Sequence, residues 1–491
     1  SQSNMMSTML QLFVVLAATL ALAQSVPTKP HVWLIIADDL GYGDLGYTGS
    51  SVKTPVIDKL AKDGVVLGHY YVMHCCTPTR SALHTGRYPI RFGLQTGVIP
   101  NNQAYGVNLT EKLLPQYMKE QGYATHAIGK WHLGLFTYDY TPTYRGYDSF
   151  MGYYGGSEDY FTHTNTGVDF HLDIGARCGP NCSQSLLDLR GNYSAPLYAD
   201  RALTIIDEHD ASVPLFLYTP YQSVHCPIEA PASYVQPYLH LHPQRQVFAG
   251  MLAALDEAIG RVQTAFNEKQ MDSNLLIIFS TDNGGPVGSK QGHPSGIGCA
   301  TGSQNWPLRG GKGAYYQGGV RGTAWVHGPM LHSSLIGTTN FELMHVVDLL
   351  PTLVEAAGGV ASSNAPHVLD GVSQWSTLLA GTKSPRVDLL INIERDHPTT
   401  AASPTPGCHG EAQYAVIKGN YKLLVGGGGQ PNDWYHDDLP YPNASAPVPE
   451  GGCITQQQQQ HLHDHHHQQH QPQQQQRTRH DYTDNNYDDD H

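Results

Sequence analysis

Short apolar segments alternate with helix-like segments through most of the chain. Residues 32–37 and 275–280 are continuous apolar runs, as expected of strands buried on both faces of a parallel sheet. Residues 123–128 and 214–218 are shorter predicted strands. Helical spacing predicts further helices at 54–60 (capped by Thr54), 110–121, 197–208, 247–267 and, despite Pro351, 344–357. This alternation predicts an α/β sandwich with a largely parallel central sheet.

The pattern changes after about residue 385. Residues 387–393 and 414–425 are predicted strands, and the second run turns at Gly419 and Asn420. We therefore expect a main domain over 31–384 and a small C-terminal sheet domain over 385–455. Residues 456–491 are rich in Gln, His and Asp. Because such a composition cannot bury a core, this tail is predicted to be disordered.

The amino-terminal segment is typical of a secretory signal. Residues 10–22 are apolar, and Ala21-Leu22-Ala23 is a small-x-small cleavage site, so 1–23 is predicted to be a signal peptide with leader residues. The run is short for a membrane span, and no second long apolar run follows. We therefore expect no membrane span in the mature chain and a location in the secretory pathway, either lysosomal or extracellular.

Charge and cysteine content agree with that compartment. The formal net charge is −14, and lysines and arginines are scattered, which argues against a nucleic-acid partner. Eight cysteines suit an oxidising compartment. Cys178 and Cys182 are close enough in sequence to bridge, Cys408 and Cys453 flank the small domain, and the connectivity stays open. Four glycosylation acceptors are present, at Asn108, Asn181, Asn192 and Asn443.

Acidic and amide side chains follow two of the predicted buried strands. Asp38 and Asp39 come after 32–37, and Asp282 and Asn283 come after 275–280. Ligands bind at the carboxyl ends of strands in open α/β sheets. Carboxylate and amide oxygens suit a hard divalent cation such as calcium or magnesium, whereas zinc prefers His or Cys. The sequence therefore predicts one such cation at this edge.

Cationic and imidazole side chains stand in comparable places. Lys130 and His132 share one short loop after a predicted strand, His225 follows another, and Lys312 lies in a glycine-rich segment. Cys76 is expected just before a helix that begins near Pro78, where a helix N-terminus favours an anion. These groups offer anion binding and acid–base chemistry.

Several strings resemble one enzyme family. Cys76-Thr77-Pro78-Thr79-Arg80, followed by Thr85-Gly86-Arg87, resembles the activation signature of the type I sulfatases. The resemblance runs in order from about His31 to Leu424. It continues through the strings at Asp38–Asp44, Gly129–Gly134, Ser223–His225, Ser280–Gly285 and Asn305–Gly322. The strings at Gly155–Tyr160 and Asn305–Gly310 are most similar to the arylsulfatase B, I and J branch.

The resemblance implies a fold and a chemistry. It implies an alkaline-phosphatase-like α/β domain over 31–384 that is catalytic. Cys76 would be oxidised by the formylglycine-generating enzyme to formylglycine, whose hydrate attacks the sulfur of a sulfate ester. One Ca²⁺ would be held by residue 76 together with Asp38, Asp39, Asp282 and Asn283. The implied active-site residues are Arg80, Lys130, His132, His225 and Lys312. The branch implies N-acetylgalactosamine 4-sulfate groups of glycosaminoglycans, hence a sulfated carbohydrate partner.

Two other interpretations remain open. A hydrolase of phosphate or phosphonate esters shares the logic of metal plus nucleophile, but would more often present Ser or Thr as the nucleophile. A secreted, catalytically inactive glycan-binding homologue is the second. It gains weight because this chain turns into the Gln/His tail where the family usually continues into another strand and helix, which suggests an incomplete small domain. Cys226 and Cys299 also depart from the branch and could bridge across the pocket mouth.

Overall fold

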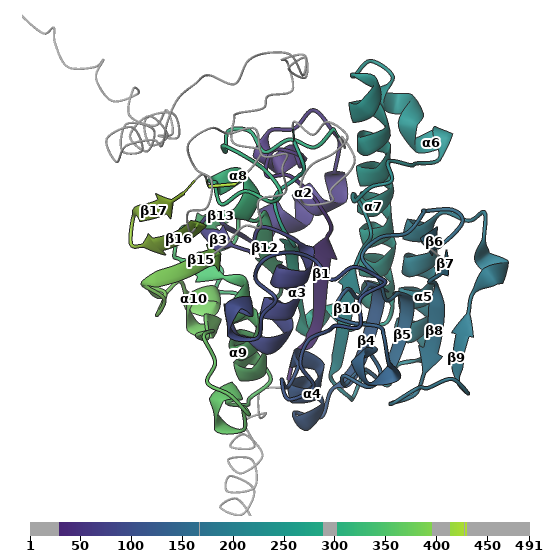
Figure 1. Cartoon of the computed structure of the whole chain (residues 1–491), viewed down its shortest axis with the longest axis horizontal. Helices are drawn as coiled ribbons and strands as arrows, with labels where there is room; N and C mark the ends of the chain where they lie inside the picture. Colours follow the sequence, from purple (N-terminus) through teal and green to yellow (C-terminus); the bar gives the residue numbers. More distant parts are fainter. Residues whose placement is uncertain (1–28, 166, 288–301, 395–412, 427, 430–491) are drawn as a thin grey trace, which may run out of the picture. The chain divides into compact units, whose positions relative to one another are not determined.

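The structure is a computed structural model that describes residues 29–165, 167–287, 302–394, 413–426 and 428–429. Its fold is built around one mixed sheet. Strand β1 (His31–Ala37) lies between β10 (Leu215–Pro220) and β11 (Leu275–Thr281), and all three are parallel (Figure 1). Next to β10 come β4 (Ala124–Lys130) and β5 (Ser149–Tyr153), also parallel. The order of the ten strands is β13-β2-β12-β11-β1-β10-β4-β5-β8-β9.

The two ends of this sheet are less regular than its centre. On one side, β12 (Ala324–His327) is antiparallel to β11 and β2 (Val65–Leu67), and β13 (Thr338–Asn340) pairs in parallel with β2. On the other side, β8 (His171–Ile174) and β9 (Ser183–Ser185) are antiparallel. The largely parallel centre is therefore the part that places strand ends together.

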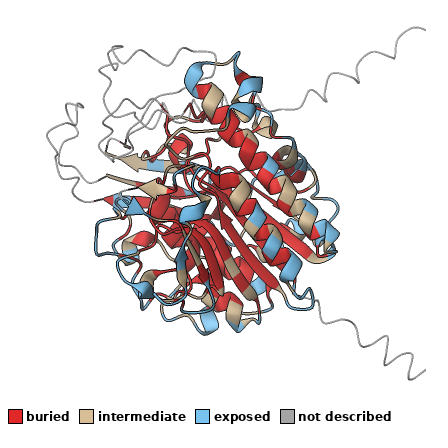
Figure 2. Cartoon of the chain, turned by 90° about the vertical axis from the view of Figure 1, so that its right-hand side faces the viewer, coloured by how far each residue is buried: buried red, intermediate tan, exposed pale blue. Residues whose placement is uncertain are grey.

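Helices cover both faces of the sheet. Alternate residues of β1 face opposite layers: Val32, Leu34 and Ile36 belong to one apolar cluster, and Trp33 and Ile35 belong to the other. The first cluster includes residues of α3 (Cys76–Thr85), α4 (Leu114–Glu120), α9 (Leu349–Ala356) and α10 (Trp375–Ala380). The second includes α2 (Pro55–Lys62), α5 (Ser194–Glu208) and α7 (Pro243–Glu268). Figure 2 shows the buried strands between these helices. This two-sided burial is why β1 is apolar without alternation.

A separate antiparallel sheet follows the main one. It contains β15 (Asp388–Glu394), β16 (Gln413–Lys418) and β17 (Tyr421–Val425). Leu389, Ile391 and Ile417 pack with Tyr315 and Val320 of the main body. The predicted strands and the turn at Gly419 and Asn420 are confirmed, while the exact domain limits at 384/385 and 455 stay predictions.

The remaining short elements complete the chain order. They are β3 (Tyr70–Tyr71), β6 (Thr164–Asn165), β7 (Gly167–Val168), α6 (Ala232–Val235), α8 (Gln317–Val320) and β14 (Met344–His345), with 3₁₀ turns at Gly46–Thr48, Pro89–Arg91, Tyr138–Tyr140, Leu187–Leu189, Gln236–Tyr238, Asp272–Asn274, Val346–Asp348 and Ala361–Ser363.

Three predicted helix starts are wrong. Helix α3 begins at Cys76 rather than near Pro78, because proline is tolerated within the first turn, where its missing N–H has no partner anyway. Helix α4 begins at Leu114, not at residue 110. The segment 344–357 opens with β14, which pairs with β3, and a 3₁₀ turn before α9 begins at Leu349. Pro351 then falls in the first turn of α9 and breaks no helical hydrogen bond.

Thr54 precedes α2 as expected, but its hydroxyl does not cap the helix. It donates to Asp58 and accepts from the Gly46 N–H instead.

Some predictions fall outside the described residues. These are the signal peptide at 1–23, the tail at 456–491, Cys299, Cys408, Cys453 and Asn443. Within the described part, no helix is both long and apolar enough to cross a bilayer. Asn108, Asn181 and Asn192 are exposed. Cys178 and Cys182, which are close enough in sequence to bridge, form a disulfide.

Candidate active site

The predicted site residues meet at the carboxyl edge of the central strands. The register places Ala37 of β1 opposite Thr281 of β11, so Asp38 and Asp282 leave the sheet side by side. Lys130 is the last residue of β4, and His225 follows β10. Parallel strands present their carboxyl ends at one edge, which is why residues far apart in sequence converge there.

Three buried ion pairs form the base of the site. The Lys130 ammonium donates to Asp38 Oδ2 at 2.6 Å, and the Lys312 ammonium donates to Asp39 Oδ2 at 2.8 Å. Arg80 donates to Asp282 Oδ2 from Nε and Nη2, at 3.2 and 2.9 Å. Arg80 Nη1 also donates to the Lys130 carbonyl, which links α3 to β4. Three acidic side chains are thus each paired with a basic side chain in a region closed to solvent.

The charges of these groups depend on one another. Burial, together with Asp282 nearby, raises the pKa of Asp38 to about 8. Burial would also raise the pKa of Asp39, but Lys312 and His225 outweigh it and hold this pKa below its usual range. Burial opposes the charge on Lys312, yet Asp39 raises the Lys312 pKa well above its ordinary value. The site therefore holds Lys312 firmly charged.

Cys76 occupies the first position of α3, inside this cluster. Its sulfur lies 3.8 Å from Asp38 Oδ1, and the residue is 1% exposed. Among the described residues, Cys75 and Cys76 are free thiols, and burial raises the pKa of the Cys75 thiol well above its ordinary value. The N-terminus of α3, which has ten residues, adds a partial positive charge beside residue 76.

His132 is held by backbone on two sides. Its Nε2–H donates to the Ile99 carbonyl at 3.0 Å, which fixes the tautomer and leaves Nδ1 as the basic nitrogen. His132 Nδ1 is buried with no hydrogen-bond partner in the described structure. Thr77, next to Cys76, donates to the His132 carbonyl and accepts from the Ile99 N–H. His132 also has a positive φ of 61°. These backbone contacts therefore fix the orientation of the ring.

His225 faces the same carboxylates from the other side. Its Nδ1–H donates to the Cys226 carbonyl at 2.6 Å, so Nε2 is directed to Asp39 Oδ2, 3.6 Å away. Burial lowers the pKa of His225, although its side chain is still 12% exposed. Cys226 is disulfide-bonded, and its predicted partner Cys299 lies outside the described residues.

The donor set fits a divalent cation. One ligand atom from each of Asp38, Asp39, Cys76 and His225 lies within 4.8 Å of the others. Asn283 adds an independent sign: its Nδ2 donates to Asp39 Oδ1, while its buried Oδ1 has no partner among the described residues. A buried carbonyl oxygen without a donor is costly unless a cation or water satisfies it. Asp282 offers Oδ1, which accepts the Asp39 N–H at 3.2 Å.

Two supporting residues were not predicted as functional. Asn305 accepts from the Gly285 N–H and donates to the Gly285 and Gly310 carbonyls, so it holds the loop that carries Lys312. The sequence places Asn305 within a sulfatase-like string but does not indicate this supporting role. The Ile99 carbonyl that orients His132 left no sequence signal at all, since any residue supplies a carbonyl.

The fold and the site together define a hydrolase of the alkaline-phosphatase-like class. Residues 30–360 match the sulfatase family, and the chain belongs to that family. It is 40% identical to arylsulfatase J of Mus musculus, over 83% of this chain and 66% of that protein. It is 33% identical to arylsulfatase A of Homo sapiens, over 76% of this chain and 73% of that protein. The chain thus spans about two thirds of the length of the first of these relatives.

Solved structures of other proteins share this fold. Ps i-CgsB in complex with k-i-k-neocarrahexaose is similar with a TM-score of 0.67 and 28% identity, covering 81% of this chain and 84% of that one. A phosphonate monoester hydrolase of Agrobacterium radiobacter, at TM-score 0.54 and 18% identity, shares the fold. The predicted family and fold class are therefore confirmed.

Proposed function

We propose that this chain hydrolyses sulfate esters of sugars and that its substrate group is the N-acetylgalactosamine 4-sulfate of glycosaminoglycans. The observation that carries the proposal is the position of Cys76. It opens a helix, lies 3.8 Å from a carboxylate of the cation cluster, and sits in the sulfatase signature. The substrate group is supported by the motifs shared with the arylsulfatase B, I and J branch and by the similarity to arylsulfatase J.

A modified residue and a metal ion would complete the proposed active site. A formylglycine at position 76, installed by the formylglycine-generating enzyme in the secretory pathway, supplies the hydroxyl nucleophile as its hydrate. Asp38, Asp39, Asp282 and Asn283, together with residue 76, would hold one calcium ion, which would supply positive charge for a sulfate oxygen.

The chain's own residues supply binding and proton transfer. The ammonium groups of Lys130 and Lys312 lie beside the carboxylates of the cluster and hold sulfate oxygens. Arg80, fixed by Asp282, orients the side chain at position 76 one helical turn before it. His132 accepts a proton at Nδ1, and His225, protonated on both ring nitrogens, donates the Nε2 proton to the leaving alcohol.

The test is sulfate release by the purified full chain from a panel of esters. The panel contains an N-acetylgalactosamine 4-sulfate disaccharide, its 6-sulfate isomer, 4-nitrophenyl sulfate and 4-nitrophenyl phosphate. For each preparation, mass spectrometry of the peptide that contains residue 76 measures whether this residue is cysteine or formylglycine. We expect formylglycine at position 76 and fastest turnover of the 4-sulfate sugar. Turnover of the phosphate ester alone would support the related phosphohydrolase, and no turnover by formylglycine-containing protein would support the inactive homologue.

A further inference from the structure

A cavity of about 600 Å³ lies next to the active site. Sites for small molecules commonly enclose roughly 300–1,000 Å³ and combine aromatic walls with a few polar groups. This cavity has both features: its lining includes Asn101, Phe136, Tyr138, Tyr154, Asp169 and His171. None of the described residues that line it is a lysine or an arginine.

The aromatic wall is open to a ligand. Phe136 and Tyr138 are each 40% exposed. Exposed aromatic rings gathered at a cavity indicate a ligand that presents an apolar face. The Phe136 ring packs on Tyr140, with centroids 4.5 Å apart, and Tyr154 stacks on His171 at 4.6 Å. The rings are thus held by neighbours rather than by the cavity's contents.

The polar groups provide a hydrogen-bond donor and an acceptor. Asn101 Oδ1 accepts from the Gly156 N–H at 3.0 Å, while its Nδ2 makes no hydrogen bond within the described part of the chain. Asp169 accepts one backbone N–H on each oxygen, from Tyr154 and from Gly155, and His171 Nε2 lies 3.6 Å from Oδ1. Each Asp169 oxygen keeps a lone pair for a hydroxyl.

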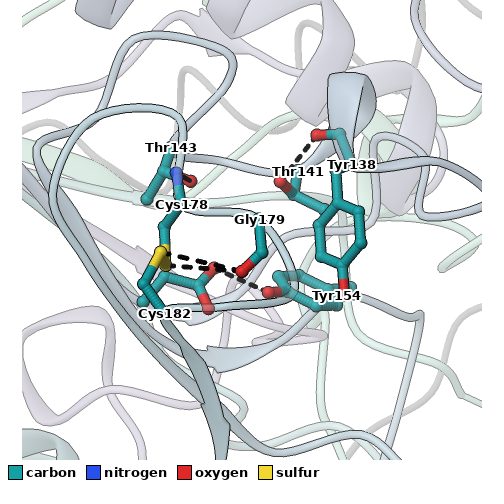
Figure 3. Close-up of a disulfide and its surroundings, with 8 residues drawn as sticks. Tyr138, Thr141, Thr143, Tyr154, Cys178, Gly179 and Cys182 are labelled. Atoms are coloured by element: carbon teal, nitrogen blue, oxygen red, sulfur yellow. Dashed lines mark hydrogen bonds between the residues drawn. A yellow bond between two sulfur atoms is a disulfide. The ribbon is translucent and has the colours of Figure 1, made fainter.

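A hydrogen bond links the disulfide loop to the segment that follows Tyr138. Figure 3 shows the Cys178–Cys182 bridge on one side of Gly179 and the rings of Tyr138 and Tyr154 on the other. The Cys178 N–H donates to Thr143 Oγ1 at 3.1 Å, and the Thr141 N–H donates to the Tyr138 carbonyl at 2.9 Å. The disulfide itself closes only the loop 178–182. The segment that carries Tyr138 is held by its own turn and by the packing of Phe136 on Tyr140, which lowers the entropic cost of binding.

The cavity is joined to the active site through His132. The His132 N–H donates to the Tyr154 carbonyl at 3.0 Å. Gly156, which Asn101 holds, packs so closely on the His132 ring that a Cβ there would lie 2.7 Å from Nε2. The cavity and the catalytic imidazole thus share one wall.

We propose that this cavity is a second sugar subsite, which takes an uncharged hexose or N-acetylhexosamine ring of the chain whose sulfate is cleaved. The inference rests on the proposed function. Aromatic rings suit the apolar face of a pyranose, and the amide and carboxylate suit its hydroxyls. A uronate fits less well than a neutral ring, because its carboxylate would meet Asp169 and none of the described lining residues is a lysine or an arginine. In a chain that alternates uronate and hexosamine, the hexosamine occupies this subsite.

The first experiment separates the subsite from the catalytic centre. Phe136→Ala and Tyr138→Ala are assayed with a sulfated tetrasaccharide and with 4-nitrophenyl sulfate, which is too small to reach both sites. We expect kcat/KM on the tetrasaccharide to fall about tenfold and kcat/KM on the aryl sulfate to stay within twofold. Tyr421→Ala, which truncates a 74% exposed tyrosine on the other sheet, is the matched control and should change neither value. Equal losses on both substrates, or no loss on either, would overturn the proposal.

The second experiment needs no turnover. Saturation-transfer NMR is recorded with N-acetylgalactosamine and with glucuronate as probes. Transfer to N-acetylgalactosamine should be several times weaker in Phe136→Ala/Tyr138→Ala than in the wild-type chain, the remainder coming from the catalytic centre, and glucuronate should give none. A signal reduced in this way in a protein that cleaves no sulfate ester would refute the proposed function alone. An undiminished signal in the double variant would refute the subsite alone.

Discussion

Arg80 and Asp282 are joined by two hydrogen bonds that end on the same oxygen. Nε and Nη2 of the guanidinium donate to Asp282 Oδ2 at 3.2 and 2.9 Å, and both residues are buried. Because Oδ2 is taken by Arg80, only Oδ1 of Asp282 can turn toward the cluster that contains Asp39. One carboxylate therefore ties the helix that begins at Cys76 to the end of β11.

Replacing Cys76 should remove activity while leaving the fold intact. Cys76→Ala deletes the only side chain proposed as nucleophile, so we expect kcat on 4-nitrophenyl sulfate to fall by at least about 1,000-fold with an unchanged melting temperature. The neighbouring thiol is the matched control, since Cys75 is equally buried. Cys75→Ala should keep both formylglycine and activity. Full activity in protein whose residue 76 is unmodified cysteine would refute the role.

The cation site can be tested at Asp39. Asp39→Asn keeps the shape of the side chain but removes a negative charge that Lys312 and Asn283 now face. Calcium affinity should fall by more than the roughly 10–100-fold typical of losing an outer-shell partner, as measured by calorimetry on the full chain. Asp256→Asn, another buried carboxylate that accepts from the Val56 and Ile57 N–H groups, should bind calcium normally. Stoichiometric zinc without calcium in the wild type would contradict the assignment.

His225 should matter most for poor leaving groups. Because His225 is the proposed proton donor, we expect His225→Ala to lower kcat on a sugar sulfate by about 10²–10⁴-fold. Nitrophenolate needs little protonation, so the loss on 4-nitrophenyl sulfate should be less than about tenfold. Parallel kcat measurements on the two esters decide the point. If the two losses are equal, His225 binds sulfate or metal rather than donating a proton.

Gly156 should be intolerant of a side chain. A Cβ at this position would lie 2.7 Å from Cε1 and Nε2 of His132, so Gly156→Ala must displace the ring from the Ile99 carbonyl. A displacement near 1 Å is expected to lower kcat about 100-fold. Gly97→Ala is the control, because nothing lies within 4 Å of a Cβ at that glycine. Calcium and formylglycine contents should match the wild type in both variants, and unchanged kcat in Gly156→Ala would contradict this role.

Acid should destabilise the protein partly through His84. Burial lowers the pKa of His84 to about 3, against 6.5 for the free side chain. Between pH 6.5 and pH 3, only the unfolded chain protonates the His84 ring. The contribution of His84 to the free energy of unfolding is therefore full above pH 6.5 and is lost as the pH falls toward 3. Between pH 7 and pH 5 the loss is about 2 kcal/mol.

His84→Gln tests this effect. The variant should be less stable at pH 7, because His84 bonds the Arg80 carbonyl and the Tyr147 hydroxyl, but its unfolding free energy should fall less on going to pH 5. Denaturant unfolding at both pH values provides the measurement. His332→Gln, at an exposed position, should follow the wild type. A variant with the same pH slope as the wild type would exclude His84 as the source.

The sequence alone determined the layer architecture and the candidate residues that gather at the strands' carboxyl ends. Continuous apolar runs such as 32–37 require burial on both faces, and only a sheet covered by helices on both sides provides that. Asp38 and Asp282 follow such runs, so local chain chemistry already placed them at a strand's carboxyl end. The sulfatase signature around Cys76 is likewise a local pattern, readable without coordinates.

Tertiary structure decided the pairings, because these depend on strand order and on backbone atoms that every residue possesses. Lys130 pairs with Asp38 and Lys312 pairs with Asp39, a choice set by the neighbours of β1 in the sheet. The tautomer of His132 follows from the Ile99 carbonyl, and the contact with Gly156 follows from how two distant loops pack. The start of α3 at Cys76 was also a tertiary outcome, since local rules permit proline at any of the first helical positions.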